Sequence, residues 1–171
     1  NQIKSKEWLV NTLIEYLPEI NKKYPRIFIA GGWYGLTAAI LKQKLNVYND
    51  IISCDIDPMT KSIGERLTNK QRVFFKIDNA VSHFIHNRKD YNILINTSCE
   101  HMEQDDLEFM CDARVKGTIV CFQSNNYHEI DSHINCHDSL SDFIDSLPLK
   151  NIIYKNEQIL PNCTRYMVIG S

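Results

Sequence analysis

Glycines and an acid with the spacing of a nucleotide site lie between residues 26 and 57. An apolar run enters a glycine-rich turn, a helical stretch follows, and a second apolar run ends at an acid, so the residues concerned are Gly31, Gly32, Gly35 and Asp55. Glycines let backbone N–H groups and a helix N-terminus approach a ligand, and a carboxylate about twenty residues further on can accept hydrogen bonds from ribose hydroxyls. This arrangement favours a nucleotide site over a purely structural turn.

A second group of candidate residues follows the fourth and fifth apolar runs. Histidine has a pKa near working pH, so His101 or His133 can serve as a general base, with Glu100 orienting or polarising it. The alternative is that Glu100 and His101 only begin an acidic helix, because the helix dipole favours an acid at that end. We leave both interpretations open.

The same region raises the question of a metal. Besides Glu100 and His101, it contains the possible ligands His128, His133, Cys136 and His137. Imidazole and carboxylate groups bind zinc and related ions, but the spacing here matches no closed zinc motif. We therefore expect no metal. If one does bind, we expect Glu100, His101 and His133 to hold it.

Strands and helices alternate along the chain and must position these residues. Apolar runs predict strands at 27–29, 51–55, 72–78, 91–97, 117–125, 151–160 and 164–170, and helical patterns lie at 5–20, 37–45, 58–67, 79–88, 103–113 and 139–147. Near-continuous apolar strands that alternate with helices indicate a parallel sheet covered on both faces. Only three residues join the last two strands, which requires them to be antiparallel neighbours.

Capping and helix-breaking residues mark the ends of these helices. We expect Ser5 to cap the leading helix and Pro18 and Pro25 to close it. Asn46, Asn49 and Asp50 are expected to end the second helix, Pro58 to open the third, and Ser139 or Asp138 to cap the last. Two further histidines fall on the surface of the fourth helix, where no special role is expected: His83 and His86.

The composition is that of one globular domain. The chain has 171 residues, 19 basic and 21 acidic side chains and a formal net charge of −2. No basic patch supports a nucleic-acid partner, and no apolar run approaches the ~20 residues that span a bilayer. The six cysteines form no Cys-x-x-Cys pair, which suits a reducing cytosol. We expect a single domain over 1–171, with a leading helix in 1–24 and a core in 26–170.

The element order, with one acid after the second strand and another after the third, resembles a class I S-adenosylmethionine-dependent methyltransferase from Arg26 to Gly170. The resemblance implies an α/β, Rossmann-like fold of seven mostly parallel strands in the order 3-2-1-4-5-7-6. The last two strands would form an antiparallel hairpin, and helices would cover both faces. The chain also resembles short methyltransferase-like proteins of bacteriophages, so we expect a cytoplasmic protein, in the host cytoplasm if it is phage-encoded.

The resemblance implies S-adenosyl-L-methionine as cofactor and assigns residues to it. The first turn would hold the methionine part, Asp55 the ribose and the segment after the third strand the adenine, while the fourth strand would end beside the transferred methyl group. The implied cofactor residues are Ala30, Gly31, Gly32, Gly35, Asp55, Ile56, Asp78, Asn79, Ala80, Asn96 and Thr97. Two residues depart from the family pattern: Trp33 replaces a glycine, and Ala30 stands where an acid is usual.

A Glu-His pair after the fourth strand and a histidine-containing loop after the fifth also resemble a pattern of several small-substrate and RNA-end methyltransferases. This similarity implies Glu100, His101 and His133 as catalytic residues. The aromatic and polar residues expected to contact substrate are Trp33, Tyr34, Tyr127 and His128, whereas Phe122, in mid-strand, is expected in the core.

The leading hypothesis is methyl transfer to an N or O nucleophile of a small molecule, or of a partner that brings its own docking surface. A second hypothesis is aminocarboxypropyl transfer from the same cofactor, as in nicotianamine synthases. A third is an NAD-binding protein, because the turn Ala30-x-Gly32-x-x-Gly35 is close to that fingerprint. A fourth is a non-catalytic fold kept for protein interaction. The sequence does not determine the oligomeric state.

Overall fold

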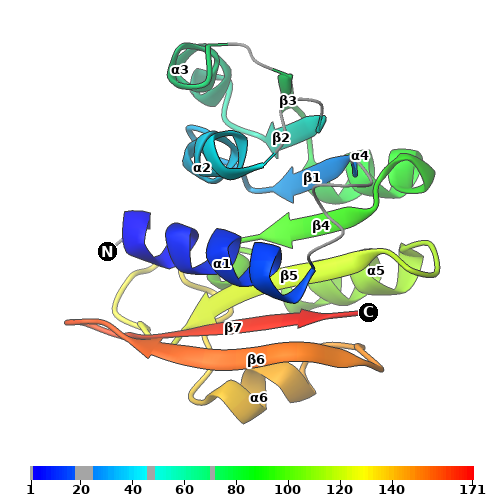
Figure 1. Ribbon diagram of the computed structural model, residues 1–171. Coiled ribbons are helices and arrows are strands. Elements are labelled where there is room, and N and C mark those ends of the chain that lie inside the picture. The colour runs from blue at the N-terminus through cyan, green and yellow to red at the C-terminus, as the bar shows by residue number, and fades with distance from the viewer. Residues whose placement is uncertain (1, 18–24, 46–48, 70–71) are drawn as a thin grey trace.

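The computed structural model describes residues 2–17, 25–45, 49–69 and 72–171, and a seven-stranded sheet runs through its centre (Figure 1). The strand order is β3-β2-β1-β4-β5-β7-β6, as predicted. The strands are β1 (Ile27–Ala30), β2 (Ile51–Asp55), β3 (Val73–Ile77), β4 (Ile93–Asn96), β5 (Ile119–Asn125), β6 (Ile152–Ile159) and β7 (Thr164–Gly170). The first five are parallel, and β7 is antiparallel to both β5 and β6.

The register aligns the carboxyl ends of the parallel strands. Ala30, the last residue of β1, pairs with Cys54 of β2 and with Asn96 of β4. The loops that leave these strands therefore start at one edge of the sheet. Such an edge, where neighbouring crossovers leave the sheet in opposite directions, is where α/β proteins bind ligands.

Helices cover the two faces of the sheet (Figure 1). One face packs against α1 (Gln2–Tyr16) and α2 (Leu36–Lys44), and the other against α4 (Ala80–Asn87), α5 (Gln104–Ala113) and α6 (Leu140–Asp145). The third helix, α3 (Met59–Leu67), packs beside β3 and α2. Strand residues alternate between the two cores, so that Ile27 and Ile29 face α1 and α2 while Phe28 faces α4. This two-sided burial explains the continuous apolar runs.

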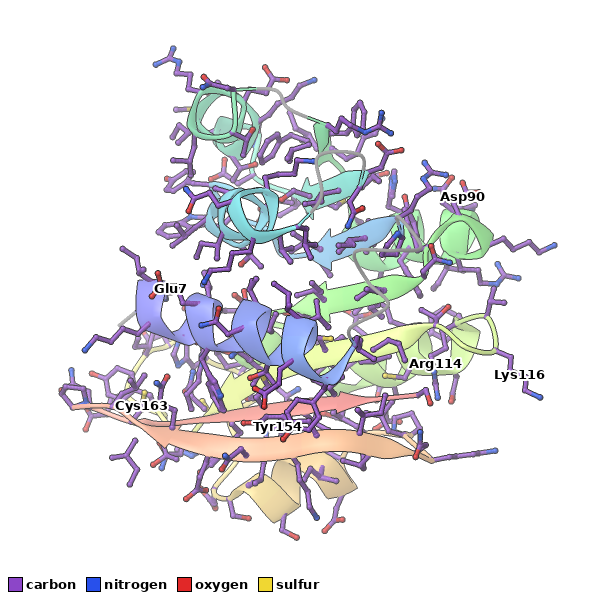
Figure 2. The ribbon with its side chains drawn as sticks, in the orientation of Figure 1. Glu7, Asp90, Arg114, Lys116, Tyr154 and Cys163 are labelled. Atoms are coloured by element: carbon purple, nitrogen blue, oxygen red, sulfur yellow. The ribbon has the colours of Figure 1, made fainter. Side chains whose placement is uncertain are left out.

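The first helix packs on the antiparallel strands β6 and β7 and runs along their direction (Figure 1). Figure 2 shows Tyr154 of β6 under this helix, and its hydroxyl accepts a hydrogen bond from Trp8 Nε1 at 3.2 Å. Leu9, Val10 and Leu13 are buried along the same helix face. The helix starts at the end of the sheet where the β6–β7 turn, which contains Cys163, also lies. Its first turns therefore reach the edge at which the parallel strands end.

Several predicted boundaries change. The first helix runs from Gln2 to Tyr16 rather than over 5–20, so the prediction that Ser5 caps it is wrong. Ser5 is buried within the helix and donates a hydrogen bond to Gln123 of β5, because packing on the sheet extends the helix before it. Pro58 immediately precedes α3 rather than opening it. Ser139 does cap α6, since its Oγ accepts a hydrogen bond from Asp142 N at 3.0 Å.

Pro18 and Asn46, expected to end helices, lie outside the described residues. All six cysteines are free thiols, and Cys54 and Cys121 are buried in strands. Within the described ranges, no helix is both long enough and apolar enough to cross a membrane.

Candidate functional site at the carboxyl edge of the sheet

A cavity of about 610 Å³ opens at the carboxyl edge of β1, β2, β3 and β4. Its walls come from the loops after these strands, from the first turns of α1 and from the start of α5. The lining residues are Gln2, Lys6, Gly31, Gly32, Trp33, Leu36, Asp55, Ile56, Asn79, Ala80, Val81, Thr97, Ser98, His101, Met102, Glu103, Asp106 and Ile134. This volume lies within the range of ~300–1,000 Å³ typical of small-molecule sites.

The turn after β1 is shaped by its glycines in two ways. Gly31 has φ +60° and lines the cavity, and a Cβ there would meet no atom within 4 Å. Gly35 also has a positive φ, +78°, but a Cβ there would come within 2.6 Å of the Phe75 ring. Gly35 is thus required for packing and does not line the cavity. Of the predicted glycines, Gly31 and Gly32 are the two placed at the cavity.

Trp33 continues this turn in the left-handed conformation, with φ 45°. Trp33 is one of the lining residues, its indole stacks on the Tyr34 ring with centroids 4.3 Å apart, and the residue remains 51% exposed. The tryptophan that departs from the family pattern therefore forms part of the cavity rim. Tyr34 itself lies outside the lining.

Asp55 ties the turn after β1 to the end of β2. Its Oδ2 accepts a hydrogen bond from Trp33 N at 2.8 Å, and its Oδ1 accepts one from Asp57 N at 3.0 Å. Each carboxylate oxygen has a second lone pair, so the group can accept hydrogen bonds from a ligand while it holds the turn. Asp55 and its neighbour Ile56 both line the cavity.

After β3, the cavity is lined by Asn79 and by Ala80 and Val81 at the start of α4, whereas Asp78 lies outside the lining. Asp78 Oδ2 lies 3.1 Å from His83 Nδ1, and its Oδ1 accepts a hydrogen bond from Asn79 N. The bond to His83 and then the bond from Asn79 N lower the pKa of the Asp78 carboxyl. Asp78 is thus next to the cavity in sequence but is not one of its lining residues.

His83 has a structural role that its position in the sequence did not indicate. Its ring stacks on Phe28, with centroids 5.7 Å apart, and its Nε2 lies 3.3 Å from the Tyr91 hydroxyl. The expectation of a surface histidine is therefore wrong for His83. His86 Nδ1 lies 2.7 Å from Ser82 O, within its own helix.

Lys6 is a cavity residue that sequence reasoning missed. It is only 6% exposed, and its ammonium donates a hydrogen bond to Gln2 Oε1 at 2.6 Å. Burial, reinforced by the nearby Arg165, lowers the pKa of Lys6 to about 8. The signal was present, because Lys6 shares the buried helix face of Leu9 and Leu13 at helical spacing.

A buried polar network supports the loop after β4. The Arg165 guanidinium of β7 donates to Glu100 Oε1 at 2.6 Å, to Thr97 O at 2.6 Å and to Ser5 Oγ at 3.3 Å. Gln123 exchanges two hydrogen bonds with Ser5. Glu100 and Arg165 are both almost fully buried, and their ion pair joins β7 to the loop after β4. The hydrogen bonds of Ser5 add α1 to the same network.

The structure brings together three residues that were selected from the sequence as catalytic candidates and as ligands if a metal binds: Glu100, His101 and His133. A possible ligand atom of each lies within 4.8 Å of the others, and the two imidazole rings meet edge to face with centroids 4.6 Å apart. They line a second cavity of about 180 Å³, which also contains Tyr127 and shares His101 with the larger one. Glu100 and His101 form a 3-10 turn, Cys99–His101, rather than the start of α5.

The remaining predicted residues support the site or lie away from it. Ala30 is fully buried in β1, and Asn96 lies behind the lining, where its Oδ1 accepts a hydrogen bond from Ser98 N. Thr97 lines the cavity as expected. His128 is exposed and pairs with Asp138 outside both cavities. Phe122 is fully buried in the core.

No protein-family model matches the sequence, and no curated protein matches it either. Solved structures do match its fold. Magnesium protoporphyrin IX methyltransferase from Synechocystis PCC 6803, solved with bound S-adenosylmethionine, superposes with a TM-score of 0.67 at 10% identity and covers 98% of this chain and 80% of its own. The O-methyltransferase from Bacillus cereus in complex with S-adenosylhomocysteine superposes with a TM-score of 0.65 at 10% sequence identity. The match covers 97% of this chain and 80% of the O-methyltransferase chain.

The bifunctional kinase-methyltransferase WbdD gives a TM-score of 0.66 at 13% identity over 95% of this chain. Our chain spans only 38% of that protein's length. At these identities the similarity concerns the fold. Strand order, the antiparallel hairpin and these structural matches together show that the chain has the fold of class I S-adenosylmethionine-dependent methyltransferases.

Proposed function

We propose that this protein binds S-adenosyl-L-methionine and transfers its methyl group to an N or O nucleophile of a small acceptor. The observation that supports this most directly is the cavity at the carboxyl edge of the sheet. It runs from the glycine turn, past Asp55, to Asn79 and Ala80. Proteins of the same fold have been solved with this cofactor or its demethylated product bound.

The lining fits the three parts of the cofactor. Val81 and Ala80 offer an apolar surface for adenine, and the Asp55 carboxylate has lone pairs for the ribose hydroxyls. Lys6 is a buried cation suited to the methionine carboxylate. The acid usually found at position 30 is absent, but Glu103 and Asp106 line the cavity and supply negative charge for the ammonium group. The residues present therefore fit the cofactor.

The bound cofactor would supply an electrophilic methyl group, so the chain itself must position an acceptor and remove a proton. His101 is suited to the second task. Its Nδ1 lies 2.9 Å from Ser132 O, so the carbonyl of Ser132, rather than Glu100, orients the ring. The tautomer with hydrogen on Nδ1 leaves Nε2 as a free base. His101 lines both cavities, and the smaller one, which contains Tyr127, is the proposed acceptor site.

Calorimetric titration with S-adenosylhomocysteine tests the cofactor assignment. We expect Asp55→Ala to weaken binding by about 10-fold or more, because a lost charged hydrogen bond costs at least ~1.4 kcal/mol. Asp57→Ala is the matched control, since the Asp57 carboxylate accepts a hydrogen bond from Met59 N and lies outside the cavity lining. Equal affinities for the two variants, with both folded by circular dichroism, would contradict the assignment.

Product analysis then tests the reaction. Incubation with S-adenosylmethionine and a panel of small acceptors should release S-adenosylhomocysteine. Release of methylthioadenosine instead would indicate aminocarboxypropyl transfer and would overturn the proposed methyl transfer.

A further inference from the structure

The cluster of Glu100, His101 and His133 has the composition of a metal site with open positions. Two imidazoles and one carboxylate, supplied by separate segments, are a common ligand set for divalent transition metals. Their candidate ligand atoms lie within 4.8 Å of one another. Metal–ligand bonds of ~2.0–2.2 Å place the ligands of one ion ~3–4.4 Å apart, so small side-chain adjustments would complete the site.

Both imidazole rings are held through Nδ1 by backbone carbonyls. His101 Nδ1 lies 2.9 Å from Ser132 O, and His133 Nδ1 lies 2.7 Å from Tyr127 O. A carbonyl can only accept a hydrogen bond, so each ring carries its hydrogen on Nδ1 and leaves a lone pair on Nε2. Metal-binding histidines typically have this support from a backbone carbonyl or a carboxylate.

The carboxylate provides an independent indication. Glu100 is 3% exposed, and its Oε1 is paired with Arg165 at 2.6 Å. Its Oε2 is buried and has no hydrogen-bond partner among the described residues. An unpaired buried carboxylate oxygen is costly, and its presence in a native structure calls for a missing partner such as an ion. Arg165 neutralises the carboxylate without using that oxygen.

The loop between β5 and α6 is anchored so that His133 stays beside Glu100. His137 N donates to Asn125 O at 3.0 Å, and Asn135 N donates to Glu100 O at 3.1 Å. Ser124 Oγ donates to Asn135 O as well. These bonds hold a loop without helix or strand against the turn that contains the other two residues.

We propose that Glu100 Oε2 and the Nε2 atoms of His101 and His133 bind one divalent transition-metal ion. The ion would lie beside the proposed cofactor cavity, because His101 lines that cavity as well. Three protein ligands leave at least one coordination position for a water or an acceptor oxygen. With the ion bound, His101 Nε2 would be a ligand rather than the general base assigned above, and the ion would instead lower the pKa of the group held in the open position. This inference differs from our expectation from the sequence, where ligand spacing matched no zinc motif.

Cobalt(II) titration of the whole chain, first stripped with EDTA, tests the site without any cofactor. We expect one Co²⁺ per chain, reported by visible d–d absorption. Loss of a supporting residue around a metal site weakens binding 10–100-fold, so His133→Ala, which removes a ligand, should weaken it by about 100-fold or more. The matched control is His128→Ala, which removes an exposed histidine of the same loop and should leave affinity within about twofold.

Three results would overturn the proposal: no saturable binding by the wild type, equal affinities for wild type and His133→Ala, or a thiolate-to-cobalt charge-transfer band. The last would identify Cys136, whose Sγ lies 3.8 Å from His133 Nδ1, as a ligand instead. Titration of the same samples with S-adenosylhomocysteine separates the two proposals. If the wild type binds S-adenosylhomocysteine but no cobalt, the metal site is refuted. If the wild type binds cobalt but no S-adenosylhomocysteine, the proposed function is refuted.

Discussion

The lowered pKa of Lys6 predicts that the protein takes up a proton when it binds S-adenosylhomocysteine. Lys6 is a buried cation whose pKa is lowered to about 8, mainly by burial and then by Arg165. If the methionine carboxylate pairs with Lys6, the opposite charge must raise the pKa of this group again. Binding of S-adenosylhomocysteine should therefore be accompanied by uptake of a proton near pH 8.

The size of the effect follows from this pKa. At pH 8 about half of the free protein has a neutral Lys6, so binding should take up as much as ~0.5 proton per ligand. At pH 6.5 only about 3% of Lys6 is neutral, and uptake by this group should nearly vanish. Glu100 and Arg165 are the other charged groups acting on Lys6, and the imidazole of His101 also lines the cavity.

Calorimetry in buffers with different ionisation enthalpies measures this quantity, because the observed heat varies linearly with the number of protons exchanged. Lys6→Met isolates the contribution of Lys6 from that of the histidines, and Lys4→Met is the control on an exposed position of the same helix. We expect the uptake at pH 8 to disappear in Lys6→Met alone. Equal uptake in wild type and Lys6→Met would refute the assignment of Lys6 to the carboxylate.

The same pKa makes Lys6 destabilising in the absence of ligand. The folded protein holds this proton less tightly than the unfolded chain, so stability should rise with pH between about 8 and 10.5. The lowered pKa of Lys6 corresponds to a destabilisation of the folded protein by about 3 kcal/mol, which is present in full below pH 8. Lys6→Met should thus stabilise the apo protein in urea denaturation at pH 7, and much less at pH 10.5. No gain at pH 7 would contradict the buried placement.

Two further predictions concern stability. Arg165→Met should lower the free energy of unfolding by about 3–5 kcal/mol in urea denaturation, because it leaves the buried Glu100 carboxylate without its counter-charge. Adding Glu100→Gln should recover part of that loss. If the losses of the two single variants simply add in the double variant, the two residues are not coupled. Gly35→Ala should lower the free energy of unfolding by about 2–4 kcal/mol, because Gly35 has a positive φ and an added Cβ would clash with Phe75. Gly117→Ala is the control: it also has a positive φ but has open space around it, so it should cost only about 1–2 kcal/mol. Similar losses in the two variants would refute the packing role of Gly35.

Local patterns were sufficient to predict most of the framework. Apolar runs and the helical patterns between them predicted the strands and helices in chain order, and the resemblance to class I methyltransferases implied the order of strands in the sheet. The acid at the end of the second strand lines the cavity. Asn79 and Ala80 also reach the cavity as expected. Asp78 does not, because His83, five residues along the chain, holds its carboxylate. Position after a strand cannot by itself distinguish Asp78 from Asn79 and Ala80. The direction of a side chain at the end of a strand also depends on the hydrogen-bond partners near it.

Contacts between distant segments decided the remainder of the site. Ser5 bonds to Gln123 across 118 residues, and Arg165 pairs with Glu100 across 65. These contacts bring α1 to the edge of the sheet and explain why Lys6 lines the cavity and why the helix begins before Ser5. The pattern of apolar residues in a sequence predicts which face of a helix or strand is buried. It does not predict which other helix or strand packs against that face.

The sequence by itself therefore determined the order of strands and helices, the glycine turn and the acid of β2, because local periodicity and backbone preference act over a few residues. Only the tertiary structure decided that Lys6 lies buried beside the proposed cofactor site. It also decided that Glu100, near His101 and His133, keeps one oxygen without a hydrogen-bond partner in the described part of the chain. Burial and electrostatic pairing depend on the whole fold. They lower the pKa of Lys6 and pair Glu100 with Arg165 through one oxygen only.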